Sequence, residues 1–331
     1  MASVLRSEIR RFDVVHLHSV FLWPTFAAAR AAQAAEIPYV VSPRGMLVAD
    51  LIRRRNRLVK SAWLAVCERG NLERAAAIHA TSHIEAAELG QFRWRLPGTA
   101  VIPNGVTVAD ADDWAGAEVS PDVREAATGS LVLFLGRISW KKGPERLLHA
   151  FARTQGGTLA IVGPDDEGLT PRLRVLARDL GIAERVRFVP RGVLGADKAH
   201  LYRAARVFVL PSFSENFGNT ILEAMQNARP VVVTPQVGAA EIVRAASAGL
   251  VADGDPASFG AAIDRLLADR PLAEEMGAAG RRYVVANLSW AAVAADMEAL
   301  YETIRLSRCT NIARPIAQRD TDRSMPELQR T

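Results

Sequence analysis

The chain has 331 residues, of which 49% are hydrophobic and 6% aromatic, and its formal net charge is +5. This length exceeds what one core ordinarily spans and favours two domains. Only two cysteines occur, Cys67 and Cys309, so a disulfide framework is excluded and a reducing cytoplasm is the simplest setting. No run of about 18 apolar residues exists, which argues against a membrane-spanning helix.

Along the first half of the chain, short apolar runs alternate with longer helix-like stretches. We expect helices at 25–35 and about 50–75, and strands at 13–18, 39–43, 76–82 and 99–106. Residues 107–122 are acidic, lack a clear period and are interpreted as a linker with a short helix. This alternation predicts a parallel α/β sheet covered on both faces.

Five cations fall within residues 53–60, in the segment LIRRRNRLVK. Two interpretations remain open: a solvated helix face, or peripheral contact with an anionic membrane, where each cation contributes about 1 kcal/mol. No aromatic platform or DNA-reading motif accompanies the charge. We therefore expect no nucleic-acid partner.

A more regular series begins after the linker. Strands are expected at 130–138, 158–163, 185–190, 205–210, 229–235 and 249–253. Helices are expected at 143–154, at 169–181 with Gly181 closing it, at 196–205 and at 219–228. Residues 257–305 are predicted to be helical, the last helix being amphipathic over 289–306, and the polar tail from 307 is predicted to be disordered.

The segment FLGRISWKKG is the first candidate site, because ligands of parallel sheets lie at the carboxyl ends of their strands. A strand ends at Gly136, the following loop carries Arg137 and Lys142, and a helix starts near Gly143. Two cations beside a helix N-terminus would hold a diphosphate, the lysine as a point charge and the arginine as a fork. The alternative is a pair of solvated loop cations.

The segment SENFGNTILE is the second candidate site. The amides at the helix start, from Asn216 to Gly218, suit an anion, whereas Glu215 suits the hydroxyl groups of a sugar. Glu223 suits the paired hydroxyls of a ribose. Thr220 and Glu223 also match a T-x-x-E capping box, which would explain Glu223 without a ligand.

Two histidines, His16 and His18, lie on the same face of the first strand. We expect His16 to be packed and His18, at the strand exit, to reach a ligand. No third ligand with suitable spacing follows, so no metal site is predicted. Three carboxylates in GPDDEG, residues 163–168, are interpreted as a solvated turn.

The motifs taken together resemble a known family. The segments LGRISWKKGPERLLHAF, LPSFSENFGNTILEAMQNARPVVVTPQVGAAEIV and VVSPRGML, followed by ATS and VIPNGV, are similar to retaining glycosyltransferases of family 4, which have the GT-B fold. The resemblance covers most of residues 11–305. Glu215 and Glu223 match the E-x7-E motif of that family, and Arg137 and Lys142 match its phosphate-binding pair.

The resemblance implies two Rossmann-like domains with parallel sheets. The acceptor-side domain would span 1–109, the nucleotide-sugar domain 110–288 and a crossover helix 289–306. Arg137, Lys142 and Glu215 would be catalytic. The donor would contact the following residues: Gly136, Pro190, Arg191, Asn216, Phe217, Gly218, Asn219, Thr220 and Glu223. His18 and Arg44 would lie on the acceptor side.

The implied activity is metal-free transfer of a hexose, without a cofactor, from a nucleotide-diphosphate sugar to a glycan or lipid-linked acceptor. Anomeric configuration would be retained, by front-face displacement with the leaving phosphate as base. The setting would be polysaccharide or lipopolysaccharide synthesis, in the cytoplasm or peripherally at the inner face of the cell membrane. A non-catalytic nucleotide-sugar-binding remnant and another GT-B enzyme, such as a nucleotide-sugar epimerase, are the alternatives.

Two departures from the family pattern stand out. Where many members have T-x-H-G, this chain has SPRG, so Arg44 would supply charge in place of a histidine. The first strand, DVVHLH, matches one from the middle of the family's first domain. We therefore expect the first two or three strand-helix units to come from an upstream start or another chain, or to be lost from a truncated gene, with an exposed sheet edge as the result.

Overall fold

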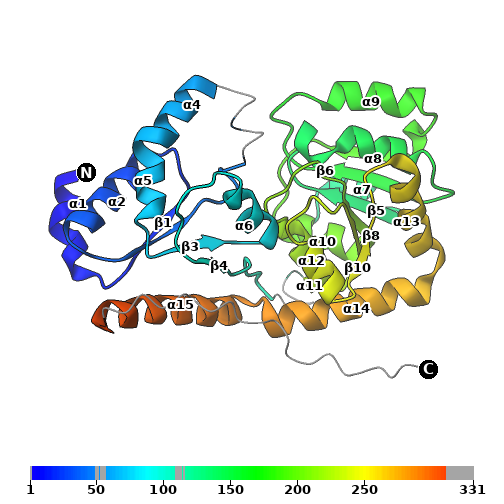
Figure 1. The fold of residues 1–331 in the computed structure, drawn as a ribbon. Coiled ribbons are helices and arrows are strands. Elements are labelled where there is room, and N and C mark those ends of the chain that lie inside the picture. Colours follow the sequence, from blue (N-terminus) through cyan, green and yellow to red (C-terminus); the bar gives the residue numbers. More distant parts are fainter. Residues whose placement is uncertain (1, 49–51, 53–56, 109–113, 115, 311–331) are drawn as a thin grey trace, which may run out of the picture. The chain divides into compact units, whose positions relative to one another are not determined.

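The computed structural model describes residues 2–48, 52, 57–108, 114 and 116–310. The chain forms two compact units, each with its own parallel sheet (Figure 1). Unit 1 comprises Met1–Ala80, Ala86–Ile102 and Asp296–Thr331, and unit 2 comprises Thr81–Glu85 and Pro103–Ala295. The predicted fold class, α/β with two parallel sheets, is confirmed.

Unit 1 contains a four-stranded sheet of order β1-β2-β3-β4. The strands are β1 (Val15–His18), β2 (Tyr39–Ser42), β3 (Ala77–Ala80) and β4 (Thr99–Val101). His18 pairs in register with Ser42, so β1 and β2 end at the same edge. The helices are α1 (Ala2–Glu8), α2 (Trp23–Ala34), α4 (Arg57–Trp63), α5 (Arg69–Glu73) and α6 (His83–Gly90), the last of which begins within unit 2.

The predicted basic helix is interrupted in its described part. Between α4 and α5 lies one stretch of π-helix, η2 (Leu64–Glu68). Such bulges often occur at functional sites. The arginines at 53–55 lie outside the described residues. Two helices of the first half, α1 and α6, were not predicted, because neither has a long apolar period.

Unit 2 contains a six-stranded sheet of order β10-β9-β8-β5-β6-β7. When β5 is numbered as strand 1 and the sheet is read from β7 to β10, the order is 3-2-1-4-5-6, as in doubly wound folds. The strand order reverses between β5 and β8. All six strands fall where the apolar runs predicted them. They are β5 (Leu131–Leu135), β6 (Thr158–Val162), β7 (Val186–Val189), β8 (Ala205–Leu210), β9 (Val231–Val233) and β10 (Gly249–Val251).

Helices cover both faces of this sheet (Figure 1). On one face lie α8 (Pro144–Phe151) and α9 (Thr170–Asp179); on the other lie α10 (Gly195–Ala204), α11 (Asn219–Gln226) and α12 (Ala240–Ala245). Burial from both sides explains why β5 and β9 are apolar throughout. The remaining helices are α7 (Pro121–Ala126), α13 (Pro256–Ala268), α14 (Arg270–Asn287) and α15 (Trp290–Thr310).

Local signals set several helix ends. Proline occupies the first turn of α8, where its missing N–H costs nothing. The Asp255 carboxylate caps α13 by accepting from the amides of Ala257 and Ser258, both at 3.0 Å. Gly181, at φ 70°, follows the end of α9, as predicted.

The last helix is longer than predicted. α15 extends to Thr310, so residues 307–310 are helical and not part of a tail. The helix continues because its last turns contain no proline or glycine. Residues 311–331, the rest of the predicted tail, lie outside the described residues. None of the described helices is both long and apolar enough to cross a membrane.

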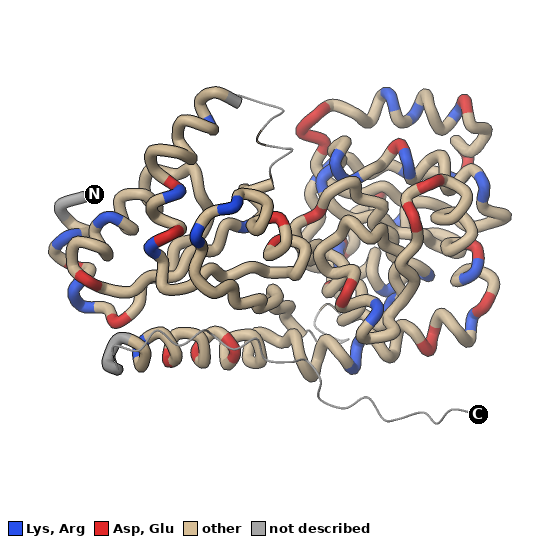
Figure 2. The backbone as a smooth tube through the Cα atoms, viewed as in Figure 1, with Lys and Arg blue, Asp and Glu red and all other residues tan. Residues whose placement is uncertain are grey.

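Charge is distributed over both units. In Figure 2, positions of both signs are interspersed along the described backbone of each unit. The net charge of +5 therefore does not by itself locate a binding surface. Individual side chains have to be considered instead.

Candidate active site

Unit 2 places two predicted ligand-binding loops at the carboxyl edge of its sheet. β5 is followed by Gly136 and Arg137, and β8 is followed by the loop that leads into α11. Because β5 and β8 are paired neighbours, both loops leave the sheet at the point where the strand order reverses. Doubly wound sheets bind their ligands at this point.

The two loops are held together by direct contacts. The Phe213 amide donates to the Lys141 carbonyl at 2.8 Å. Gly143, at φ 71°, packs so closely that a Cβ there would lie 2.3 Å from the Pro211 carbonyl oxygen. Only glycine allows this approach, so the loop carrying Lys142 has a fixed position against the β8–α11 loop.

Lys142 and Glu215 form an ion pair across these loops. Their side chains are 16% and 19% exposed, so the charges are largely withdrawn from water. The Lys142 ammonium also lies over Gly136, where a Cβ would be 3.9 Å from it. The structure thus brings together the lysine predicted to bind phosphate and the carboxylate predicted to bind sugar.

Arg137 projects from the same edge and is exposed. Within the described part of the chain, no hydrogen bond or ion pair engages its guanidinium. Nearby, β5 and β6 end in close contact, because a Cβ on Gly163 would lie 2.0 Å from the Gly136 carbonyl oxygen. The arginine is therefore a free cation at the rim of a rigid edge, beside Lys142.

The N-terminus of α11 closes the site. The carbonyl oxygens of Asn216, Phe217 and Gly218 accept bonds from Ser82 Oγ, the Ala239 amide and the Ile221 amide at 3.0, 2.8 and 2.9 Å. Among the described residues, none accepts a bond from the amides of 216–218. Those N–H groups and the helix dipole remain for an anion.

Phe217 and Gly218 contribute backbone groups, not side chains, to the candidate site at the start of α11. Phe217 is 3% exposed, so its ring belongs to the core. Gly218 takes φ 97° at the N-cap, a conformation that favours glycine. Asn219 accepts from the Asn104 amide nitrogen at 2.9 Å, which ties the start of α11 to the loop after β4.

Asn216 is fixed by a segment that is distant in sequence. Its Nδ2 donates to Thr81 Oγ1 at 2.9 Å, and its carbonyl accepts from Ser82 Oγ. Its Oδ1 is buried and has no partner in the described part of the chain, and the same holds for Ser212 Oγ and Thr220 Oγ1. Unpaired buried polar atoms are uncommon, and these three flank the start of α11.

Glu223 does not cap its helix. The N-cap of α11 is Gly218, without a side-chain bond, so the capping-box interpretation of Thr220 and Glu223 is wrong. The Glu223 carboxylate instead accepts from Lys198 Nζ at 3.0 Å and from the Tyr202 hydroxyl at 2.8 Å. Burial and the adjacent carboxylate raise the pKa of Tyr202, which keeps it a donor.

Similar hydrogen bonds hold the start of α6. Ser82 Oγ accepts from the Glu85 amide at 3.1 Å, and the Glu85 carboxylate accepts from the Thr81 amide at 2.7 Å. The Ser82–Glu85 spacing matches S-x-x-E, although the carboxylate bonds the amide of the residue before Ser82 and not that of Ser82 itself. These bonds order the hydroxyls that hold Asn216.

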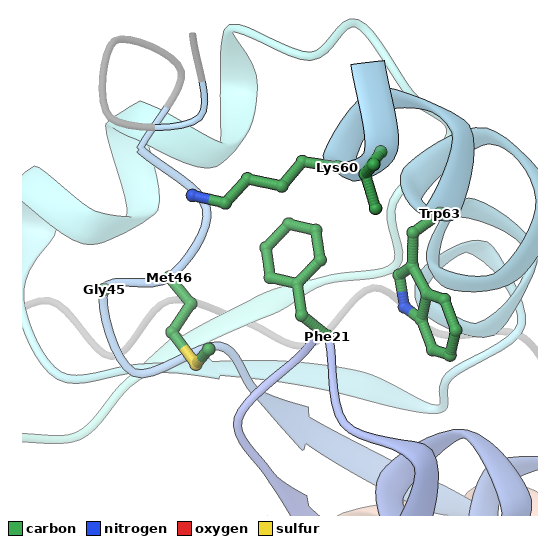
Figure 3. A pocket seen from close by; sticks show the side chains of 6 residues that line it. Phe21, Gly45, Met46, Lys60 and Trp63 are labelled. Atoms are coloured by element: carbon green, nitrogen blue, oxygen red, sulfur yellow. The ribbon is translucent and has the colours of Figure 1, made fainter. Parts of the chain in front are cut away.

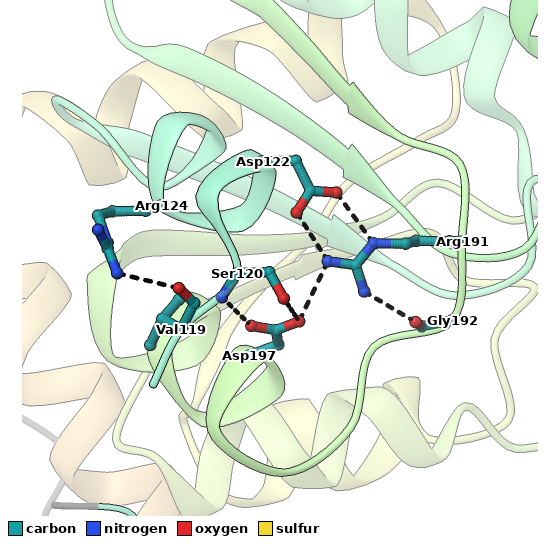
Figure 4. Close-up of polar contacts among 7 residues, drawn as sticks. All are labelled: Val119, Ser120, Asp122, Arg124, Arg191, Gly192 and Asp197. Atoms are coloured by element: carbon teal, nitrogen blue, oxygen red, sulfur yellow. Dashed lines mark hydrogen bonds and ion pairs between the residues drawn. The ribbon is translucent and has the colours of Figure 1, made fainter. Parts of the chain in front are cut away.

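Arg191, predicted to contact the donor, has its side chain engaged by other residues of unit 2 (Figure 4). Its guanidinium donates to both oxygens of Asp122 at 2.9 and 2.7 Å and to Asp197 at 3.1 Å. Hydrogen bonding to Asp122 raises the pKa of Arg191 and lowers the pKa of that carboxyl. The Arg191 amide donates to the Val189 carbonyl at 2.8 Å and Pro190 has no N–H, so the main chain offers a nucleotide only carbonyl oxygens here. Contact of Pro190 and Arg191 with the donor stays a prediction.

Arg146 was not predicted. It lies on α8 with its guanidinium carbon 3.7 Å from the centre of the Phe213 ring, and it donates to the Pro211 carbonyl at 3.3 Å. Both contacts support the loop that carries Glu215. Burial lowers the pKa of Arg146, although it stays charged at neutral pH. A basic residue near a helix N-terminus gave no signal in the sequence.

The predicted acceptor-side residues meet in unit 1. The Arg44 guanidinium donates to His18 Nδ1, at 3.1 Å from Nη2, so the proton of neutral His18 lies on Nε2. Burial and the charge of Arg44 lower the pKa of His18. Arg44 adopts φ 57°, which is unusual for a non-glycine residue.

Behind His18, one chain of hydrogen bonds links four side chains. His79 Nε2 donates to the Ile102 carbonyl at 2.9 Å, and His79 Nδ1 lies 2.7 Å from Ser42 Oγ. Ser42 Oγ also lies 2.6 Å from His16 Nε2, and His16 Nδ1 lies 2.6 Å from the Tyr301 hydroxyl. Each hydroxyl in this chain can donate or accept, so the donor at each of these three contacts follows from the tautomers of the two rings.

His16 is packed, as predicted. Burial and the neighbouring His18 and His79 lower the pKa of His16 to about 3. Its ring also stacks on His18, with centroids 4.2 Å apart. In the described ranges, no three His, Cys, Asp or Glu side chains gather as a cluster that could hold a metal ion.

Two family models match the sequence. The model of glycosyl transferases group 1 matches residues 118–283, and the model of the glycosyl transferase 4-like domain matches residues 1–105. The chain belongs to this glycosyltransferase family. The resemblance inferred from the motifs is thereby confirmed, and the matched regions include both candidate sites.

Several relatives are D-inositol 3-phosphate glycosyltransferases. The protein of Acidothermus cellulolyticus is 32% identical over 302 residues, which cover 80% of this chain and 63% of the relative. That of Geodermatophilus obscurus is 32% identical, with 91% and 69% covered. Two other relatives are covered to only 42% and 43%, so the chain spans between about two fifths and two thirds of such proteins.

Solved structures show the same fold. Sucrose-phosphate synthase from Thermosynechococcus elongatus aligns with a TM-score of 0.71 and 26% identity over 90% of this chain and 75% of its own. Anabaena Alr3699/HepE, in complex with UDP and glucose, aligns with a TM-score of 0.71 and 21% identity over 92% and 80%. Both likenesses support the GT-B glycosyltransferase fold.

Proposed function

We propose that this chain transfers a hexose from a nucleotide-diphosphate sugar to a hydroxyl of a glycan or lipid-linked acceptor, with retention of anomeric configuration. The observation that carries the proposal is the pairing of Lys142 with Glu215 at the switch point of the unit 2 sheet. One cation for phosphate and one carboxylate for sugar hydroxyls stand there side by side. A UDP donor is supported by the Anabaena structure, whose description names UDP and glucose.

The residues of unit 2 supply electrostatic stabilisation in the proposed reaction. Lys142, Arg137 and the amides at the start of α11 would face the diphosphate and stabilise the charge that develops as the sugar departs. Because these cations can neutralise a diphosphate, no metal is required. Glu223 would bind the ribose through the lone pairs that Lys198 and Tyr202 leave open.

Among the residues that the structure describes at this edge, no side chain has the geometry of a protein nucleophile paired with a base. We therefore propose front-face displacement, in which the leaving phosphate takes the proton of the acceptor hydroxyl. The sugar–phosphate bond breaks as the new glycosidic bond forms on the same face. His18 and Arg44 of unit 1 would serve the acceptor, in the cytoplasm or at the inner membrane face, in synthesis of surface polysaccharide or lipopolysaccharide.

The test is UDP release from UDP-hexoses, followed with and without added acceptor lipids and glycans. We expect Lys142→Ala and Glu215→Ala to lower turnover at least tenfold, as the loss of one charge-assisted hydrogen bond implies. Glu145→Gln is the matched control, because Glu145 lies on α8 and pairs with Arg172 rather than Lys142. Turnover unchanged in both site variants would contradict the proposal.

A further inference from the structure

Unit 1 contains a pocket at the edge where its predicted acceptor-side residues lie. The pocket has a volume of about 400 Å³ and is lined by Phe21, Gly45, Met46, Val59, Lys60 and Trp63 (Figure 3). Phe21 follows the end of β1 by three residues, and Gly45 directly follows Arg44. The pocket therefore adjoins the carboxyl ends of β1 and β2, beside His18 and Arg44.

The lining is apolar with one charge. In Figure 3 the Phe21 ring lies between Met46 and Trp63, and Lys60 extends along the other side. Val59 is 72% exposed although it lines the pocket, so the structure leaves an apolar wall open to water. Small-molecule sites have this composition, mostly apolar with a few polar groups that orient the ligand.

A buried carboxylate holds two of the residues that line the pocket. Glu68, only 3% exposed, accepts from the Phe21 amide at 2.7 Å and from Trp63 Nε1 at 2.8 Å. It belongs to the π-helix, whose extra residue per turn lets it face inward. Phe21 is held at φ 62°, a costly conformation for an aromatic residue. Two aromatic walls are thus fixed before any ligand arrives.

A ligand complementary to this pocket has a hydrocarbon part for the aromatic walls and an anionic group for Lys60. A free sugar offers neither, and inorganic phosphate offers only the second. Because the pocket adjoins His18 and Arg44, such a ligand would present its polar end to the acceptor side of unit 1. A hydrocarbon chain joined through phosphate to a glycan satisfies all three conditions.

We propose that this pocket binds the hydrocarbon chain next to the phosphate of a lipid-linked acceptor. The proposal rests on the proposed function and narrows its acceptor from a glycan or lipid-linked compound to the lipid-linked class. Lys60 contacts the phosphate, while Phe21, Val59 and Trp63 contact the first carbons of the chain. The occupant is one acceptor molecule, not the surface of a bilayer.

The experiment is calorimetric titration of the full chain with decyl phosphate below its micelle concentration, with decanol and inorganic phosphate as partial ligands. We expect decyl phosphate to bind and each partial ligand to bind at least tenfold more weakly. Lys60→Ala and Val59→Asp should each weaken decyl phosphate about tenfold. Leu58→Asp is the matched control, because Leu58 is 83% exposed on the same helix but does not line the pocket.

Any of three results of these titrations would overturn the proposed role of the pocket. They are absence of decyl phosphate binding by a folded chain, equal binding of decanol, and a loss in Leu58→Asp as large as in Val59→Asp. A chain that binds anionic vesicles but not decyl phosphate would show a membrane surface instead, which also overturns it. A parallel titration with UDP separates the two proposals, since the donor site lies in unit 2 and can fail or succeed independently.

Discussion

Replacing Glu215 by glutamine should separate nucleotide binding from sugar transfer, because the two effects have opposite signs. Without ligand, the Lys142 ammonium is engaged by the Glu215 carboxylate. A diphosphate has to displace that carboxylate or bind against its charge. A neutral amide at 215 removes the competitor, so UDP should bind more tightly to Glu215→Gln than to the wild type.

The magnitude follows from the surroundings of the pair. Exposed ion pairs contribute about 0–1 kcal/mol, whereas hydrogen bonds to charged groups contribute about 1.5–3 kcal/mol. With side chains 16% and 19% exposed, this pair lies between those classes. About 1–2 kcal/mol released to the nucleotide corresponds to UDP binding about 5- to 30-fold tighter. Transfer should fall about tenfold or more, because the amide holds sugar hydroxyls less well than the carboxylate.

The assay is calorimetric titration of wild type, Glu215→Gln and Glu215→Gln/Lys142→Ala with UDP, together with the rate of transfer. Glu145→Gln removes one negative charge from the neighbouring helix without touching Lys142, and its UDP affinity should stay within about twofold. In the double variant the gain should vanish. Weaker UDP binding in Glu215→Gln, or a gain that persists without Lys142, would refute the reasoning.

Three further variants or conditions test the framework around the sites. Since the pKa of His16 falls from 6.5 to about 3 on folding, the unfolded chain binds the extra proton between these values. The contribution of His16 to the free energy of unfolding should therefore be complete above pH 6.5 and decrease toward pH 3, by on the order of 2–3 kcal/mol after allowance for partial exposure. Urea unfolding at several pH values in this range measures the decrease. In His16→Gln the free energy of unfolding should vary less with pH. Arg191→Ala removes the ion pairs with Asp122 and Asp197 and should lower the free energy of unfolding by about 1–2 kcal/mol. The control Arg172→Ala removes an exposed ion pair and should leave the free energy of unfolding unchanged within error. Gly143→Ala should cost on the order of 2 kcal/mol in thermal denaturation and weaken UDP binding, because its Cβ meets the Pro211 carbonyl; an unperturbed variant would show that the loops are not in fixed contact.

Local signals in the sequence were sufficient to predict the strands of both units. Each strand of unit 2 is a short apolar run bounded by turn residues, and such runs can be recognised because strands buried on both faces are apolar throughout. The rule that ligands gather at strand ends selected the two loops that carry Lys142 and Glu215, but it did not predict the ion pair between them. Helix α6 was missed because it has only eight residues, too few to show a clear apolar period.

The sequence could not reveal contacts made across long separations. Asn216 is held by Thr81 and Ser82, and no local pattern links them. The T-x-x-E spacing at Thr220 suggested a capping box, but Gly218 already starts that helix, which frees Glu223 for Lys198 and Tyr202. The spacing alone therefore could not decide between a cap and a ligand-binding role for Glu223.

Calorimetric titration of the purified chain with UDP, GDP and ADP, repeated on Lys142→Ala, tests the central claim most directly. We expect one nucleotide, UDP, to bind, and its affinity to fall about 10- to 100-fold in the variant through loss of a charge-assisted hydrogen bond. That result would place the diphosphate at the edge formed by β5 and β8. Equal affinity in wild type and variant, or no binding of any nucleotide by the folded chain, would contradict the account.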